Sequence, residues 1–186
     1  MVPNHDDAVA DAAGELTIGV GLTGVGDSNE QDLGSCERIV EAAAGGTDLA
    51  QVAIALVGGS YTLGAQVENA TLTNTVAFNL TGNAVANTLT GNTANNILDG
   101  GSGVDSLIGL AGNDTYNVDL TTAGALQDTV TEAANAGTDT IVLRGLSTNT
   151  AASTITIGAN VEAIDASATG SSFLNITGNA LVNTIT

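Results

Sequence analysis

Four consecutive segments of nine residues decide the fold of this chain: TGNAVANTL (81–89), TGNTANNIL (90–98), DGGSGVDSL (99–107) and IGLAGNDTY (108–116). Glycine recurs at every ninth residue and each segment ends on a large apolar residue, at Gly82, Gly91, Gly100, Gly109, Leu89, Leu98, Leu107 and Tyr116. A fifth copy, TGNALVNTI, begins at Thr177. Self-similarity at a fixed short period indicates a repeat architecture.

Each repeat, counted from its first glycine, predicts a turn followed by a very short strand. The first six positions are rich in Gly, Asn and Asp, which favour turns, and the last three alternate polar, apolar and polar residues. Three residues of strand are not stable alone, but stacked copies form parallel ladders and merge their inward apolar residues into one core. Gly, Asn and Thr at this density disfavour helix, by several tenths to about 1 kcal/mol each relative to Ala. The pattern therefore predicts an all-β parallel β-roll or β-solenoid.

A longer repeat surrounds the short one. VEAAAGGTDLA from Val40 recurs as TEAANAGTDTI from Thr131, and TLGAQVE from Thr62 recurs as TIGANVE from Thr156. The chain is therefore expected to hold one complete module and part of another.

We expect three segments: a degenerate or flexible lead-in over 1–38, a first module over 39–129 with the nonapeptides at 81–117, and a second, truncated module over 130–186. The last copy matches the first copy almost residue for residue and has no capping residues. We therefore expect a fragment of a longer array that frays from about Ser171 onward or associates end to end.

The composition excludes several classes of partner. The 186 residues include 20 Asp and Glu but only two basic residues, Arg38 and Arg144, so the formal net charge is -18. Such a surface repels phosphate backbones and anionic lipid, which excludes nucleic-acid binding. We also expect no membrane insertion, because no window approaches 18 uninterrupted apolar residues. The N-terminus lacks the pattern of a cleavable signal, so any export is expected to use another route.

The chain has one cysteine, Cys36, and one histidine, His5. This excludes an intramolecular disulfide and any metal site built on several Cys or His ligands. With no lysine and no second histidine in the sequence, no base is available to activate Cys36 as a nucleophile. Any bound metal is therefore expected to have oxygen ligands.

DGGSGVDSL and IGLAGNDTY approach the pattern G-G-x-G-x-D-x-U-x, in which U is a large apolar residue. The chain resembles RTX-type, hemolysin-like calcium-binding proteins, and over about 39–186 its modules resemble the extended repeats of large secreted bacterial RTX proteins. The resemblance implies that calcium ions are the cofactor. It also implies a secreted or cell-surface location, with type I export followed by calcium-dependent folding outside the cell.

In an RTX roll two nonapeptides make one circuit, so each calcium ion is held between turns that lie two repeats apart. This pairs Asn87 with Asp105 on one edge and Asn96 with Asp114 on the other. The further ligands are main-chain carbonyls and two additional carboxylates, at Gly100, Gly101, Gly103, Gly109, Gly112, Asp99 and Asp119. The low ligand charge predicts weak sites of the kind found in extracellular modules.

The repeats depart from the RTX pattern at two kinds of position. Asn replaces the sixth-position Asp at Asn87, Asn96 and Asn183, and Leu110 replaces the second glycine of the fourth copy. Stacked Asn side chains can form a hydrogen-bonded ladder that needs no ion. Two interpretations follow: a metal-free Asn ladder for the TGN copies, and calcium binding for GGSGVD together with LAGND.

A glycine motif near the N-terminus lacks the context that its function requires. Gly19, Gly21 and Gly24 have G-x-G-x-x-G spacing and Glu41 lies about twenty residues further on, as in dinucleotide-binding turns. The following GDSNEQDLG has no apolar period with which to open a helix. A degenerate solenoid turn or a flexible lead-in is the expected structure.

Two pairs of carboxylates match at equivalent module positions, Glu41 with Asp48 and Glu132 with Asp139. Two carboxylates are enough for a glycosidase. A catalytic pair is normally unique in a fold, however, whereas residues that recur once per module usually do structural work. We therefore expect no enzymatic activity.

The sequence predicts a calcium-binding structural repeat segment of a secreted or cell-surface protein, such as an adhesin, that folds on calcium after export. The alternative is the accessory region of an exported protease, lipase or polysaccharide epimerase, which it helps to fold and to export. Neighbouring repeats of a longer chain, or end-to-end copies, are the expected protein partners.

Overall fold

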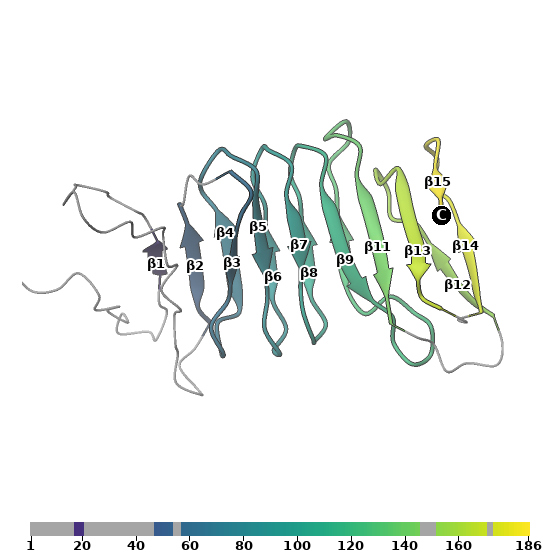
Figure 1. Ribbon diagram of the computed structural model, residues 1–186, viewed down its shortest axis with the longest axis horizontal. Coiled ribbons are helices and arrows are strands. Elements are labelled where there is room, and N and C mark those ends of the chain that lie inside the picture. The colour runs from purple at the N-terminus through teal and green to yellow at the C-terminus, as the bar shows by residue number, and fades with distance from the viewer. Residues whose placement is uncertain (1–16, 21–46, 54–56, 146–151, 171–172) are drawn as a thin grey trace, which may run out of the picture.

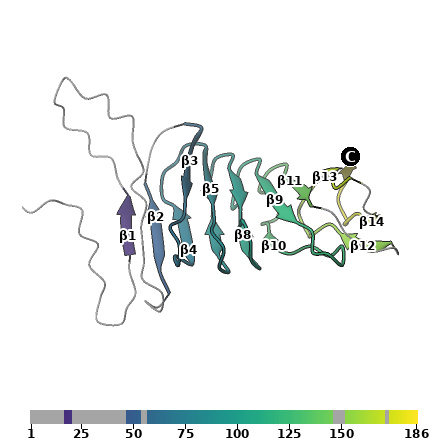
Figure 2. The same ribbon diagram turned by 60° about the horizontal axis from the view of Figure 1, so that its bottom comes forward.

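The computed structural model describes residues 17–20, 47–53, 57–145, 152–170 and 173–186. Within these residues the chain is all β, with fifteen short strands and no helix. The strands stack in chain order along one long axis (Figures 1 and 2), and from β2 to β11 they alternate between two facing sheets. The chain forms a parallel β-solenoid of about six turns, which confirms the predicted fold class. The described part of the chain holds no helix with the length and hydrophobicity needed to cross a membrane.

All strand pairs within the sheets are parallel. The first sheet has the order β1 (Thr17–Val20), β2 (Leu49–Val52), β4 (Asn69–Leu72), β6 (Thr88–Thr90), β8 (Ser106–Ile108) and β10 (Thr129–Thr131). The second has the order β15 (Thr184–Ile185), β13 (Ala163–Ala168), β11 (Thr140–Arg144), β9 (Thr115–Asp119), β7 (Ile97–Asp99), β5 (Phe78–Thr81) and β3 (Gly59–Thr62). A separate pair, β12 (Ser153–Thr156) and β14 (Leu174–Thr177), lies at the C-terminal end of the stack (Figure 2).

Two nonapeptides make one coil of the solenoid. Leu89 of β6 pairs with Leu107 of β8 in the first sheet, and Leu98 of β7 pairs with Tyr116 of β9 in the second. All four side chains are 0% exposed and fill the narrow space between the sheets. Full burial of one such side chain stabilises the fold by about 1.5–3 kcal/mol. The prediction of a three-residue strand with one inward apolar residue is confirmed for β6, β7 and β8. It is wrong for β9, which has five residues and buries both Tyr116 and Val118, and for β15, whose two residues are exposed.

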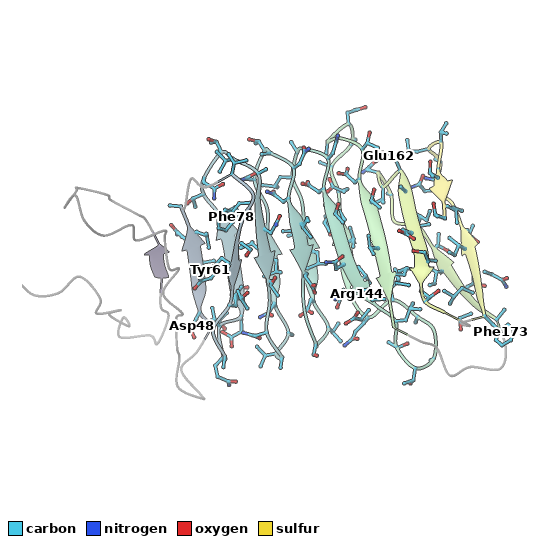
Figure 3. The ribbon with its side chains drawn as sticks, in the orientation of Figure 1. Asp48, Tyr61, Phe78, Arg144, Glu162 and Phe173 are labelled. Carbon is cyan, nitrogen blue, oxygen red and sulfur yellow. The ribbon has the colours of Figure 1, made fainter. Side chains whose placement is uncertain are left out.

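The two modules make the same contacts on different edges. The N–H of Asp48 donates to Oε2 of Glu68 at 2.9 Å, and the N–H of Asp139 donates to Oε2 of Glu162 at 2.8 Å. The strands that follow Asp48 and Asp139 are β2 in the first sheet and β11 in the second. Equivalent residues therefore lie on opposite edges, and Figure 3 shows Asp48 and Glu162 at the lower and upper edges respectively.

Only part of each chain end belongs to the described structure. Within the predicted lead-in the structure describes β1, which pairs in parallel with β2. The described residues do not include His5, Cys36 and Glu41, or Gly21 and Gly24 of the glycine motif. At the other end β15 pairs with β13, and Val182 is 92% exposed. Ser171 also lies outside the described residues, so fraying and end-to-end association stay predictions.

Leu110 adopts a left-handed backbone conformation. Its φ is +79°, close to the +82° of Gly101 at the equivalent place in the preceding repeat. This conformation costs a residue with a side chain roughly 1–2 kcal/mol. The Leu110 side chain is 42% exposed, so its burial offsets only part of that cost.

Replacing Leu110 with glycine should stabilise the protein. We expect Leu110→Gly to raise the free energy of unfolding by about 0.5–1 kcal/mol, because the relief of backbone strain exceeds the added entropy of the unfolded chain. Urea denaturation measures the change. The control is Ala111→Gly in the same turn, where φ is not positive and the substitution should be destabilising. Equal effects of the two substitutions would contradict the strain argument.

Candidate metal centre at the turn edges

The turns between the two sheets lie on two opposite edges of the solenoid. Edge A, the lower edge in Figure 1, holds the turns that enter the first sheet, residues 82–87, 100–105 and 120–128. Edge B, the upper edge, holds the turns that enter the second sheet, residues 91–96, 109–114 and 132–139. Asp105 and Asp114, nine residues apart, therefore lie on different edges.

At Asp105, Asp114 and Asp128, one carboxylate oxygen accepts an N–H from the turn one coil before. On edge A the N–H of Asn87 donates to Oδ1 of Asp105 at 2.8 Å, and the N–H of Asp105 donates to Oδ1 of Asp128 at 3.1 Å. On edge B the N–H of Asn96 donates to Oδ1 of Asp114 at 2.7 Å. The structure thus brings Asn87 next to Asp105 and Asn96 next to Asp114.

The Asn side chains of the TGN copies are engaged in hydrogen bonds. Oδ1 of Asn87 accepts the N–H of Asn83 at 2.8 Å, and its Nδ2 donates to the carbonyl of Val67 at 2.9 Å. Asn96 likewise accepts an N–H of its own turn and donates to the carbonyl of Phe78. These bonds join successive coils without an ion, but the partners of both Asn side chains are main-chain groups and not stacked Asn side chains.

The glycines predicted as carbonyl ligands shape the two Asp-bearing turns. On edge A, Gly101 and Gly103 have φ of +82° and +134°, and the carbonyl of Gly103 accepts a hydrogen bond from Gln127. A Cβ added at Gly82 would collide with the carbonyl oxygen of Gly100, so neighbouring turns are in direct contact. On edge B, Gly109 corresponds to Gly100, and Gly112, with φ of +120°, corresponds to Gly103. Leu110 occupies the position of Gly101.

One oxygen of Asp105 and one of Asp114 have no hydrogen-bond partner, although both residues are buried. Asp105 is 2% exposed and Asp114 is 1% exposed, and the unpaired atom is Oδ2 in each. Oδ2 of Asp105 lies against Gly100, and Oδ2 of Asp114 lies against Gly109. Leaving a buried polar group unsatisfied costs about 1–3 kcal/mol, and more when it is charged. A cation that prefers hard oxygen ligands fits both positions.

Residues 81–116 match the RTX calcium-binding nonapeptide repeat family, in four copies. This part of the chain is an RTX repeat region. RTX repeats bind calcium ions, so for residues 81–116 the predicted family and cofactor are confirmed. No curated protein and no solved structure matches the chain.

Arg144, at the end of β11, binds the two additional carboxylates that the sequence predicted as ligands. Its Nη1 and Nη2 donate to the two oxygens of Asp99 at 2.7 and 2.8 Å, and its Nε donates to Oδ1 of Asp119 at 3.0 Å. Hydrogen bonding to Asp99 raises the pKa of Arg144 above its usual value. Figure 3 shows Arg144 beside β9 and β11. Asp99 and Asp119 thus have an internal counter-charge, and their contribution to the RTX calcium sites stays a prediction.

Sequence reasoning left four buried acids out of the candidate ligands: Asp48, Asp128, Glu132 and Asp139. Asp128 and Asp139 end turns that are longer than those of the RTX repeats, so the nine-residue period does not reach them. The sequence did contain a signal for Glu132 and Asp139, because they repeat Glu41 and Asp48 of the first module. We interpreted this recurrence as structural.

Burial raises the pKa of the acids on both edges. The pKa of Asp114 and that of Asp128 are each raised to about 6, and the pKa of Asp105 is also raised. Burial, together with the charges of Asp139 and Asp114, raises the pKa of Glu132 to about 8. Without calcium the folded chain therefore binds protons more tightly than the unfolded chain does.

The calcium-free protein should lose stability as the pH rises. Because the folded pKa values exceed the ordinary values of 3.8 and 4.5, stability is highest near the unfolded values and falls up to pH of about 8. Thermal melts in a chelator should give a lower Tm at pH 8 than at pH 5.

The control for this pH dependence is Glu132→Gln, which removes the group with the highest of these pKa values. It should flatten the dependence of the Tm on pH between pH 6 and pH 8. Repulsion across the acidic surface is present in both proteins, so it does not account for a difference between them. A Tm that rises from pH 5 to pH 8 without calcium would contradict the assignment.

Proposed function

We propose that this chain is a calcium-dependent structural segment of a secreted or cell-surface protein, and that it completes its fold on binding calcium after type I export. The RTX repeat is a structural calcium-binding repeat, and its family is typical of secreted bacterial proteins. This supports a non-catalytic role at a location where calcium is abundant. Neighbouring repeats, or further copies end to end, are the protein partners in this proposal.

The observation that carries the proposal is the pair of buried Oδ2 atoms of Asp105 and Asp114 that have no partner. Each belongs to an Asp whose Oδ1 already accepts a main-chain N–H, so the turn is built around the carboxylate. Arg144 donates its hydrogen bonds to Asp99 and Asp119. The Oδ2 atoms of Asp105 and Asp114 therefore have no donor. A bound calcium ion supplies the missing positive charge at each edge.

The energetics favour folding outside the cell. At sub-micromolar cytosolic calcium, a chain with a net charge of -18 and 24 glycines has strong self-repulsion and a high ordering cost. An ion that binds only the folded state stabilises it by about 2.7 kcal/mol at one hundred times its dissociation constant. Export into a calcium-rich medium would then drive folding in one direction.

Calcium should stabilise the repeat region. We expect circular dichroism and thermal melts to show increased β structure and a rising Tm as calcium is titrated, because the ion binds only the folded turns. Magnesium at the same concentration is the control and should have a smaller effect, since it demands octahedral geometry and dehydrates reluctantly. No change up to about 10 mM calcium, above the dissociation constants of about 0.1–1 mM of extracellular modules, would leave the Asn ladder as the sole stabilising arrangement.

The two edges should bind separate ions. Asp105→Asn and Asp114→Asn each keep an oxygen that can accept the main-chain N–H, but remove the charge. By calorimetry each should abolish about one calcium site, with additive effects in the double variant. The control is Asp165→Asn on β13, which removes a charge away from both edges and should leave the stoichiometry unchanged. Loss of all binding from one substitution would show that the ions are coupled.

A further inference from the structure

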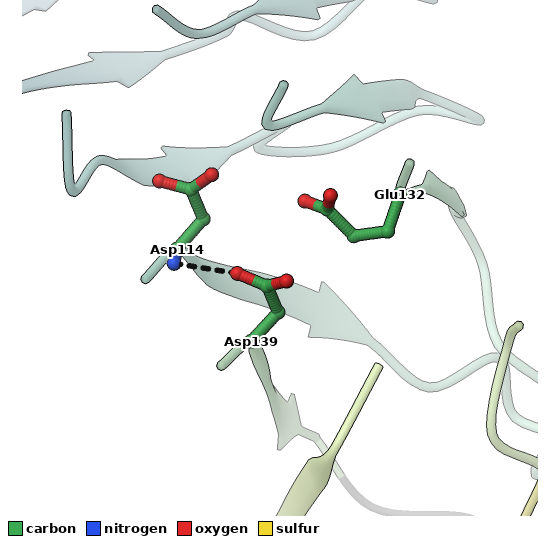
Figure 4. A group of neighbouring side chains, drawn as sticks. All are labelled: Asp114, Glu132 and Asp139. Atoms are coloured by element: carbon green, nitrogen blue, oxygen red, sulfur yellow. Dashed lines mark hydrogen bonds between the residues drawn. The ribbon is translucent and has the colours of Figure 1, made fainter. Parts of the chain in front are cut away.

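A group of three carboxylates on edge B extends beyond the RTX repeats. Asp114, Glu132 and Asp139 each offer one oxygen, and these oxygens lie within 4.8 Å of one another. Figure 4 shows the Glu132 carboxylate facing that of Asp114, with Asp139 below them. The residues are 1%, 8% and 0% exposed. Glu132 and Asp139 lie outside the residues that match the repeat family.

Two oxygens of this group have no hydrogen-bond partner: Oδ2 of Asp114 and Oδ2 of Asp139. Oε1 of Glu132 accepts a hydrogen bond from the hydroxyl of Tyr116. A Cβ added at Gly109 would collide with Oε1 of Glu132 and with Oδ2 of Asp114. Glycine at position 109 therefore leaves clear the space that both carboxylates approach.

No described basic side chain neutralises this group. Asp139 faces a further acid, because its N–H donates to Oε2 of Glu162 at 2.8 Å. Arg144 donates its hydrogen bonds to Asp99 and Asp119. The donors to the three carboxylates are all neutral: the Tyr116 hydroxyl and the main-chain N–H groups of Asn96, Asp114 and Ala133. Three buried carboxylates with neutral donors require either protons or a bound cation to balance their charge.

We propose that Asp114, Glu132 and Asp139 form a calcium site between the last RTX turn and the turn of residues 132–139. Oxygen ligands of calcium lie 2.3–2.6 Å from the ion, so oxygens up to about 5 Å apart can bind the same ion. A set of carboxylate oxygens without nitrogen or sulfur favours a hard cation. The edge B ion is then the ion of this site, bound through Oδ2 of Asp114. Three charged ligands also exceed the single Asp of the Asn87–Asp105 pair on edge A, so this site binds calcium more tightly than that pair.

This inference extends the proposed function and takes the identity of the ion from it. The proposed function and the new site share Asp114 on edge B. The edge A site uses Asp105, which takes no part in the new site. Glu132 and Asp139 belong only to the new site. Variants at Asp105 and at Glu132 therefore separate the two ideas.

The test compares calcium binding by the full chain with that by Glu132→Gln, using calorimetry and thermal melts. Gln keeps the shape of the side chain and an oxygen for the Tyr116 hydroxyl, but removes the charge. We expect Glu132→Gln to lose one bound calcium ion, or to bind that ion at least tenfold more weakly. Its Tm without calcium should not fall, because a buried charge is removed.

Asp139→Asn provides a second variant in case Glu132→Gln does not fold. It keeps an oxygen to accept the N–H of Asp114, so the ladder of edge B is preserved. It should lose the same ion. Unchanged calcium stoichiometry and affinity in the folded variant would overturn the site.

Terbium, which replaces calcium, offers a readout specific to this position. Tyr116 contacts Glu132 directly, so terbium bound there should emit on excitation of the tyrosine. Glu132→Gln should abolish this emission, and Tyr116→Phe should abolish it while one calcium per site still binds. Emission that persists in Glu132→Gln would show that the ion lies elsewhere.

The same measurements separate failure of this site from failure of the proposed function. If Asp105→Asn loses an ion and Glu132→Gln does not, the new site is wrong and the edge A site stands. If Glu132→Gln loses an ion and Asp105→Asn does not, the edge A assignment is wrong and the new site stands. Absence of calcium binding by the unmodified chain would overturn both.

Discussion

The stack depends on one recurring hydrogen bond, in which a side-chain oxygen of one turn accepts an N–H from the turn one coil before. On edge B this bond links Asn96 to Asp114, then to Asp139, and then to Glu162. It satisfies a main-chain donor that the turn would otherwise leave buried and unpaired. It also holds neighbouring coils in register, so that the inward residues of one sheet lie directly over one another. The position therefore requires a side chain that carries an acceptor oxygen.

The same hydrogen bond places negatively charged side chains of successive coils close together. Parallel strands lie about 4.8 Å apart, so acids at equivalent positions of successive coils become close neighbours. Asn at this position completes its hydrogen bonds within the protein and needs no ion, whereas Asp105 and Asp114 each keep one oxygen unpaired. The chain thus combines neutral links, which need no cation, with charged links, which are complete only with a cation. Arg144 supplies one such charge from within the chain, to Asp99 and Asp119.

The nine-residue period was enough to predict the strands of the repeat region and the inward Leu107 and Tyr116. The placement of Asp105 and Asp114 on opposite edges came from the resemblance to RTX rolls, in which two repeats make one circuit. Equal coils of two repeats bring residues 18 apart into contact, as for Asn87 and Asp105. The turns that follow β9 and β10 are longer, so Asp105 meets Asp128 at a separation of 23 residues and Asp114 meets Asp139 at 25. Arg144 meets Asp99 at 45. Such contacts depend on the length of each coil, which the sequence period alone does not specify.

The opposite placement of equivalent residues in the two modules affects any longer array. β2 and β11 begin equivalent stretches and are nine strands apart, and an odd number of strands exchanges the two sheets. Each added module would then continue the solenoid with its two faces interchanged, so two modules form the true axial repeat. An acidic pair such as Glu132 with Asp139 would appear alternately on one side and the other. A rigid partner lying along one side of such a rod would meet only every second module.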